Sequence, residues 1–166
     1  MRVAAIIFII TLFSFSCVKK KVTNPVPAIE FKDFQAWKTS AGNDTAVLVI
    51  SYEDGDGDIF RESNAKGPNL IGTFYYLNSA TQQFTTIKDL ITNDTARITQ
   101  TVLQPSTLNP NDANYKGKSV RGDMYLPWAP FRSGDSVKIF KYTVFVVDES
   151  GNKSNIITTP QFTINF

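Results

Sequence analysis

Short runs of apolar, β-branched and aromatic residues alternate with turn residues along most of this chain. Several runs alternate apolar and polar positions with a period of two and none keeps the spacing of an amphipathic helix, a pattern typical of half-buried strands. The pattern predicts strands over residues 29–37, 45–52, 70–77, 84–87, 96–103, 118–126, 137–147 and 156–166. Seven or eight strands in one unit indicate an all-β fold, an antiparallel β-sandwich.

Two of these runs are nearly continuous in apolar residues. The stretch AVLVI occupies residues 46–50 and VFVVD occupies residues 144–148, so we expect both to be central strands. Pro160 lies inside the last run and lacks an N–H donor, which predicts an edge strand or a bulge there. Gly122 interrupts the run of residues 118–126 and is interpreted as a bulge.

The N-terminal segment has a different character. Arg2 is followed by an apolar stretch over residues 3–15, which as a helix would reach about 20 Å and could not cross a hydrocarbon core of about 30 Å. These features predict a signal peptide over residues 1–16. The stretch Ser14-Phe15-Ser16-Cys17 resembles the lipobox of bacterial lipoproteins, in which a small residue precedes the cysteine that is acylated and becomes the new N-terminus.

This resemblance implies lipidation of Cys17, which follows the apolar stretch directly and is the one cysteine of the chain. Secretion without a lipid and an uncleaved anchor through Val18 remain the alternatives. Residues 17–27 carry three lysines and two prolines, so we expect a flexible tether there. One folded domain is expected over residues 28–166.

The composition excludes several kinds of chemistry. Of the residues, 42% are hydrophobic and 19% are charged, which are values of a globular protein. The absence of histidine and of a second cysteine excludes Ser-His-Asp and Cys-His catalysis, zinc bound by histidine, and an intramolecular disulfide. The net charge of +2 is spread along the chain, which argues against a nucleic-acid partner. Carboxylates, hydroxyls and lysines remain for chemistry, and a carboxylate pair could in principle cleave a glycoside. Such a pair needs a concave cleft, which a sandwich this small rarely supplies, so we expect a protein that is not an enzyme.

Two segments carry a resemblance to a known family. The sequences ISYEDGDGDI at residues 50–59 and YTVFVVDESGNKSN at residues 142–155 are similar to immunoglobulin-like domains of Bacteroidetes lipoproteins. The resemblance implies an immunoglobulin-like sandwich on a lipid anchor, in a largely uncharacterised family. Surface export in that group requires acidic residues after the lipidated cysteine, and lysines stand here instead. This implies an outer-membrane lipoprotein that faces the periplasm.

The same group of exported proteins carries a three-residue O-glycosylation motif. Asp-Thr-Ala and Asp-Ser-Val tripeptides in this chain resemble it, and they give three candidate acceptors, namely Thr45, Thr95 and Ser136. Because the motif is so short, chance occurrence is the alternative.

Asp54, Asp56 and Asp58 alternate with glycines, a spacing that suits the oxygen ligands of calcium. Ile59 and Ala65 stand where an EF-hand loop needs glycine and glutamate, so an EF-hand is excluded. If residues 45–52 and 137–147 are the second and sixth strands of an immunoglobulin-like sandwich, the loops after them meet at one end. Three further candidate calcium ligands would then join this cluster, namely Asp148, Glu149 and Asn152. The alternative is a solvated pair of turns.

Exposed aromatic side chains would suit a glycan-binding face, whereas buried ones would belong to the core. The candidates are Trp37, Tyr75, Tyr76, Tyr115, Tyr125 and Trp128, and we expect Trp128, beside two prolines, to be exposed. The sequence therefore predicts a membrane-anchored, non-catalytic structural or interaction module of the cell envelope, with calcium as its candidate ion. Its partner is an unidentified envelope protein, and a glycan-binding module is the alternative.

Overall fold

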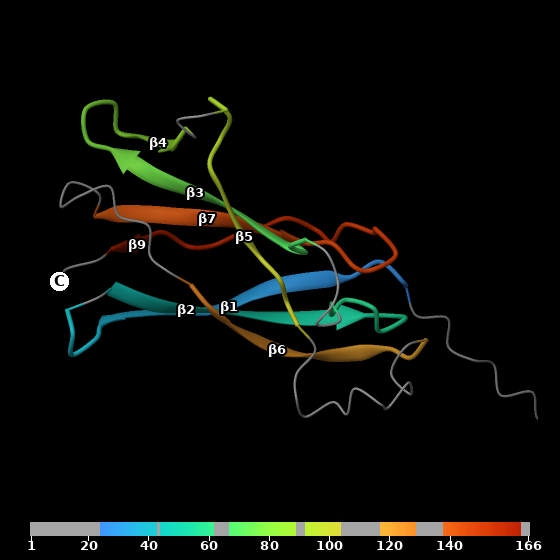
Figure 1. Cartoon of the computed structure of the whole chain (residues 1–166). Helices are drawn as coiled ribbons and strands as arrows, with labels where there is room; N and C mark the ends of the chain where they lie inside the picture. Colours follow the sequence, from blue (N-terminus) through green and yellow to red (C-terminus); the bar gives the residue numbers. More distant parts are fainter. Residues whose placement is uncertain are drawn as a thin grey trace, which may run out of the picture.

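The computed structural model describes residues 24–42, 44–61, 67–88, 92–103, 117–128 and 138–163. These ranges form two antiparallel sheets that face each other (Figure 1). One sheet has the order β1-β2-β6, with bounds Ala28–Lys38, Asp44–Asp54 and Val120–Pro127. The other contains β4 (Gln83–Thr86), β3 (Leu70–Asn78), β7 (Ile139–Val146) and β8 (Ile157–Thr158), with β5 (Arg97–Gln100) on β3 and β9 (Phe162–Thr163) on β7.

The predicted all-β fold is confirmed. β1, β2 and β6 share one sheet and β3 and β7 share the other, which is how an immunoglobulin-like sandwich arranges its A, B and E strands and its C and F strands. The described ranges contain no helix, and hence none able to span a bilayer. The predictions for residues 1–16, Cys17, Tyr115 and Ser136 lie outside the described residues and stay predictions.

Most strands begin and end within one or two residues of their predicted bounds. The exceptions are the run of residues 96–103, of which only Arg97–Gln100 is strand, and the last run. That run is divided into β8 and β9, and Pro160 lies between them, because a residue without an N–H cannot continue the ladder on β7. As predicted, β2 and β7 are central in their sheets.

The core lies between the two sheets and follows from the alternation of side chains along each strand. Along β7, Phe140, Tyr142, Val144 and Val146 are buried and the residues between them are only partly covered. The facing sheet contributes buried side chains from β2 and β6, namely Leu48, Ile50, Met124 and Leu126. Burying each such side chain contributes about 1.5–3 kcal/mol, so the packing of two apolar faces holds the loops that leave these strands in fixed positions.

Trp128 belongs to this core, and the prediction that it is exposed is wrong. Only 2% of its surface is exposed, and its ring packs edge-on against Tyr142 with centroids 5.5 Å apart. Gly72 makes the space, because a Cβ atom there would lie 2.8 Å from the indole ring. The complementarity of a glycine and a tryptophan distant in sequence decides the burial.

The prediction of a bulge at Gly122 is also wrong. The pairing of β2 with β6 runs without a shift from Val47↔Pro127 to Asp54↔Val120. A Cβ atom at Gly122 would lie 3.2 Å from the Tyr52 hydroxyl, so close packing explains this glycine. The bulge of this sheet lies instead in β1, between Phe31 and Asp33.

A candidate cation site at one end of the sandwich

Three aspartates follow one another at alternate positions where β2 leaves its sheet. Asp54 is the last residue of β2 and pairs with Val120 of β6. The chain then turns, with Gly57 at φ 77°, a left-handed conformation that residues with a Cβ rarely adopt. The glycine therefore allows the turn that carries Asp58 back toward the strand end.

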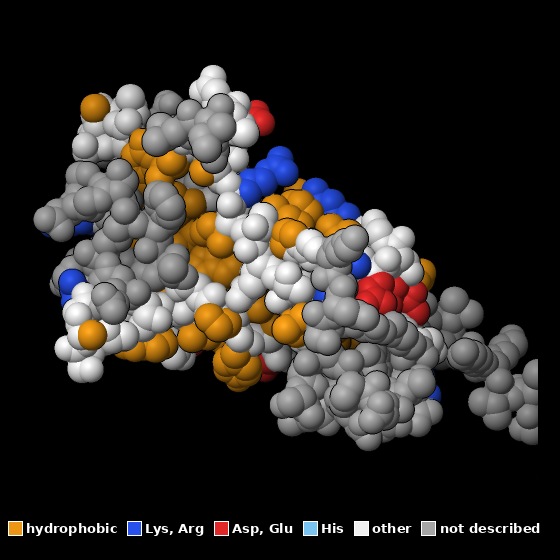
Figure 2. Space-filling view, in the orientation of Figure 1, with side chains coloured by type: hydrophobic (Ala, Val, Ile, Leu, Met, Phe, Trp, Pro, Cys, Tyr) orange, Lys and Arg blue, Asp and Glu red, His pale blue; other side chains and the backbone are white. Residues whose placement is uncertain are grey.

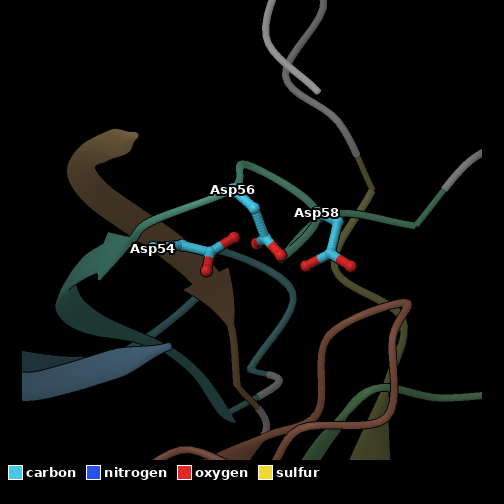
Figure 3. A group of neighbouring side chains, drawn as sticks. All are labelled: Asp54, Asp56 and Asp58. Carbon is cyan, nitrogen blue, oxygen red and sulfur yellow. The ribbon is translucent and has the colours of Figure 1, made fainter. Parts of the chain in front are cut away.

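The three carboxylates converge. Each of Asp54, Asp56 and Asp58 offers one carboxylate oxygen, and these oxygens all lie within 4.8 Å of one another. Figure 3 shows the three side chains turned toward a common region inside the loop. Oxygen ligands of calcium lie about 2.3–2.6 Å from the ion, so two ligands of one ion are at most about 5 Å apart. The three oxygens therefore fit around a single cation.

One oxygen of each of the three carboxylates is shielded from water, although Asp56 and Asp58 as whole residues are only partly buried. Asp54 is 0% exposed. In each of the three side chains Oδ1 is buried and has no hydrogen-bond partner among the described residues. The alternative of a solvated pair of turns would require these oxygens to face solvent. A buried acceptor without a partner costs about 1–3 kcal/mol, and more when it is charged.

The electrostatics are equally unfavourable without a counter-charge. Burial, together with the charges of Asp56, Asp58 and Asp148, raises the pKa of Asp54 from 3.8 to about 6, against the opposing effect of one hydrogen bond from the Ile59 N–H to Oδ2 (3.0 Å). Burial followed by the charge of Asp58 also raises the pKa of Asp56. The loop is therefore built to concentrate negative charge in a poorly solvated place.

The loop after β7 reaches the same end, as the immunoglobulin-like strand order predicts. Ser150 donates from its backbone N–H (3.0 Å) and from its hydroxyl (2.6 Å) to Asp58 Oδ2. The Glu149 N–H donates to the Asp58 carbonyl (3.0 Å), and the Gly117 N–H, shortly before β6, donates to the Asp56 carbonyl. Acidic side chains gather at this end in the space-filling view (Figure 2, right). The loop after β7 and the residues just before β6 thus both contact the aspartate loop.

The second group of predicted ligands has a different role from the first. Asp148 is 0% exposed and accepts from the backbone N–H of Asn152 (2.7 Å) and from its side-chain Nδ2 (2.9 Å). The Asn152 amide nitrogen is therefore directed at Asp148, and Asp148 acts on Asp54 and Asp56 through its charge. Neither Asp148 nor Glu149 joins the converging group of three.

Ser150 is the contact that the sequence analysis did not anticipate. It lies in the same turn as Glu149 and Asn152, and that position was the one signal that could have indicated it. A serine can donate to a carboxylate from both its N–H and its hydroxyl. Which carboxylate it binds depends on which one the fold brings near.

The aromatic candidates are distributed between core and surface. Tyr125 is 70% exposed and Trp37 is 44% exposed, and both stand on the outer face of the β1-β2-β6 sheet. Tyr75 and Tyr76 are partly buried in β3. The candidate acceptors Thr45, in β2, and Thr95, which forms an isolated bridge with Lys88, are partly buried as well.

No protein-family model, curated protein or solved structure matches this chain. The chemistry of the site therefore rests on its own geometry. Clustered carboxylate oxygens that are shielded from solvent can hold a hard cation.

Proposed function

We propose that this chain is a non-catalytic interaction module of the cell envelope whose loop end is held together by a bound calcium ion. The observation that carries the proposal is the fully buried carboxylate of Asp54, whose Oδ1 has no partner among the described residues and faces two more carboxylates. A divalent cation would supply the missing contacts and cancel the repulsion that raises the pKa of Asp54 and Asp56.

The ligand chemistry favours calcium over other ions. Aspartate oxygens are hard ligands, and the described residues at this site contain none of the thiolate or imidazole groups that zinc and copper prefer. Magnesium keeps several of its waters and is usually bound through one or two carboxylates. Three converging carboxylates in a water-poor loop suit the flexible coordination of calcium better.

The ion would act by joining the two sheets. Asp54 continues β2 of one sheet, and Asp58 is bonded to Ser150 in the loop that follows β7 of the other. Binding in the folded state alone stabilises a protein by RT ln(1 + [L]/Kd), about 2.7 kcal/mol at a hundredfold excess over Kd. For a domain of this size that corresponds to a rise in Tm of about 5–15 °C.

Thermal unfolding of the full-length protein in detergent tests this. We expect Tm to be higher by about 5–15 °C in calcium than in EGTA. The control variant Glu30→Gln, which removes an exposed carboxylate of β1, should show nearly the same difference in Tm as the wild type. Terbium luminescence titration should give one site per chain and lose it in Asp54→Asn. Equal melting temperatures in calcium and EGTA would exclude the calcium site.

The envelope location is a separate part of the proposal. It is supported by the lipobox-like Ser14-Phe15-Ser16-Cys17 stretch and by the lysines that follow it, which favour a lipid anchor on the outer membrane and a periplasm-facing domain. An alkynyl fatty acid should label the wild type and not Cys17→Ala, and equal labelling would exclude lipidation. Crosslinking in intact envelopes, followed by purification on a C-terminal tag, should recover a defined protein partner.

A further inference from the structure

A groove runs along the outer edge of β6. We call it the Tyr125 groove. It has a volume of about 350 Å³, within the range of ligand sites. One wall comes from the segment after β5 and the other from β6, and the residues that matter are Phe60, Gln100, Leu103, Asp123, Tyr125 and Pro127.

The path of the chain creates this groove. β5 pairs with β3 of one sheet, and the chain then crosses toward β6 of the other sheet (Figure 1). Gln100 fixes the crossing, because its Nε2 donates to the Pro127 carbonyl at 3.4 Å. Among the described residues, β6 pairs with β2 alone, so the crossing segment and β6 stand apart as two walls.

The walls present apolar surface and hydrogen-bonding groups side by side. Tyr125 is 70% exposed and Leu103 is 52% exposed, whereas Phe60 at the floor is 3% exposed. The Asp123 carboxylate is ion-paired with Lys32 at the rim. Gln100 lines the groove as well, and its Nε2 already donates to the Pro127 carbonyl, so the Asp123 carboxylate is the acceptor that the groove offers to a ligand.

We propose that the Tyr125 groove binds a neutral oligosaccharide. A pyranose ring has an apolar face of C–H groups that would lie on the exposed Tyr125 ring, and hydroxyls at its edge that would donate to the Asp123 carboxylate. Because the Asp123 carboxylate and Lys32 are paired with each other, the two groups together carry no net charge that would favour an ionic glycan. This proposal does not depend on the calcium site.

An extended peptide pairing with β6 fits less well. Such a strand needs free backbone donors and acceptors along the edge. Pro127 has no N–H, and its carbonyl already accepts from Gln100. The groove offers side-chain acceptors and a flat ring, which is the chemistry of sugar recognition.

Isothermal titration calorimetry on the full-length protein in detergent tests the proposal with four probes: cellohexaose, laminarihexaose, xylohexaose and mannohexaose. We expect at least one to bind with a stoichiometry of one, equally well in calcium and in EGTA. Tyr125→Ala should weaken binding by about tenfold or more, and Tyr125→Phe, which keeps the ring, by less than about twofold. Asp123→Asn should also weaken it, through the lost charged acceptor.

Trp37→Ala is the matched control, because Trp37 is an exposed aromatic on the same sheet face but is not part of the groove. It should bind the hexasaccharide as the wild type does. The proposal is overturned if no hexasaccharide binds, if Tyr125→Ala binds as tightly as the wild type, or if Trp37→Ala abolishes binding. Because Tyr125 is largely exposed, we expect its variants to have the same Tm as the wild type.

Discussion

Replacing Asp54 by asparagine changes the charge of the buried carboxylate with little change in shape. Without a cation, the folded pKa of about 6 against an ordinary value of 3.8 means that the folded state resists ionisation of this group. At 1.36 kcal/mol for each pKa unit, the penalty approaches about 3 kcal/mol at pH 8. Asp54→Asn removes it and keeps an oxygen that can accept from the Ile59 N–H.

The variant should therefore have opposite effects in the two conditions. In EGTA at pH 8, we expect Asp54→Asn to be more stable than the wild type by about 1–3 kcal/mol, because an uncompensated buried charge is gone. In saturating calcium the wild type gains about 2.7 kcal/mol or more, whereas the variant, with one ligand weakened, gains little. In calcium, the stability advantage of Asp54→Asn over the wild type should therefore be smaller than in EGTA, or the wild type should be the more stable protein.

Urea denaturation at pH 8, monitored by tryptophan fluorescence, measures the stability difference between the two proteins in EGTA and in calcium. The control is Glu30→Gln, which removes a carboxylate from an exposed position of β1 and should shift neither curve by more than about 0.5 kcal/mol. Asp54→Asn being clearly less stable than the wild type in EGTA would refute the reasoning from burial. Equal stabilisation of both proteins by calcium would refute the assignment of Asp54 as a ligand.

Three further outcomes are expected. In EGTA, the contribution of Asp54 to wild-type stability should be greatest below about pH 3.8 and be lost as the pH rises through about 6, because its folded pKa is raised. In calcium this pH dependence should reverse, since protons compete with the ion for the carboxylate. Urea denaturation at a series of pH values measures the free energy of unfolding in both conditions and shows whether it falls or rises with pH. Gly72→Ala should lower the free energy of unfolding, measured by urea denaturation, by about 1–3 kcal/mol, because its Cβ would lie 2.8 Å from the packed Trp128 ring. An unchanged midpoint would mean that the core around Trp128 can rearrange to accept the extra atom. Asn155→Ala should cost about 1–3 kcal/mol and speed amide exchange at Ile29, because the Asn155 side chain bonds both the N–H and the carbonyl of Ile29 at 2.8 Å; unchanged exchange would argue against this clamp.

The strands could be predicted from the sequence because their signal is local. Alternation along residues 137–147 places Phe140, Tyr142, Val144 and Val146 on one face whatever lies opposite. Pro160 likewise interrupts a ladder wherever the strand is placed, since it has no N–H. The spacing of Asp54, Asp56 and Asp58 by itself indicates oxygen ligands, because neighbours on a tight glycine-containing loop are close in space by connectivity.

Burial of single polar or aromatic groups is a different matter, because it depends on partners distant in the chain. Trp128 is buried only because Gly72 leaves it room, and the Asn155 side chain forms its two hydrogen bonds only because the fold brings Ile29 of β1 beside it. The burial that leaves Asp54 Oδ1 without a partner, and the hydrogen bonds from Ser150 to Asp58, also required the two sheets to meet. The sequence by itself determined the all-β pattern and the acidic loop, which are properties of neighbouring residues. The tertiary structure decided which oxygens lose their water and which aromatic ring, Tyr125, stays exposed beside a groove, since both depend on contacts between segments that only the fold brings together.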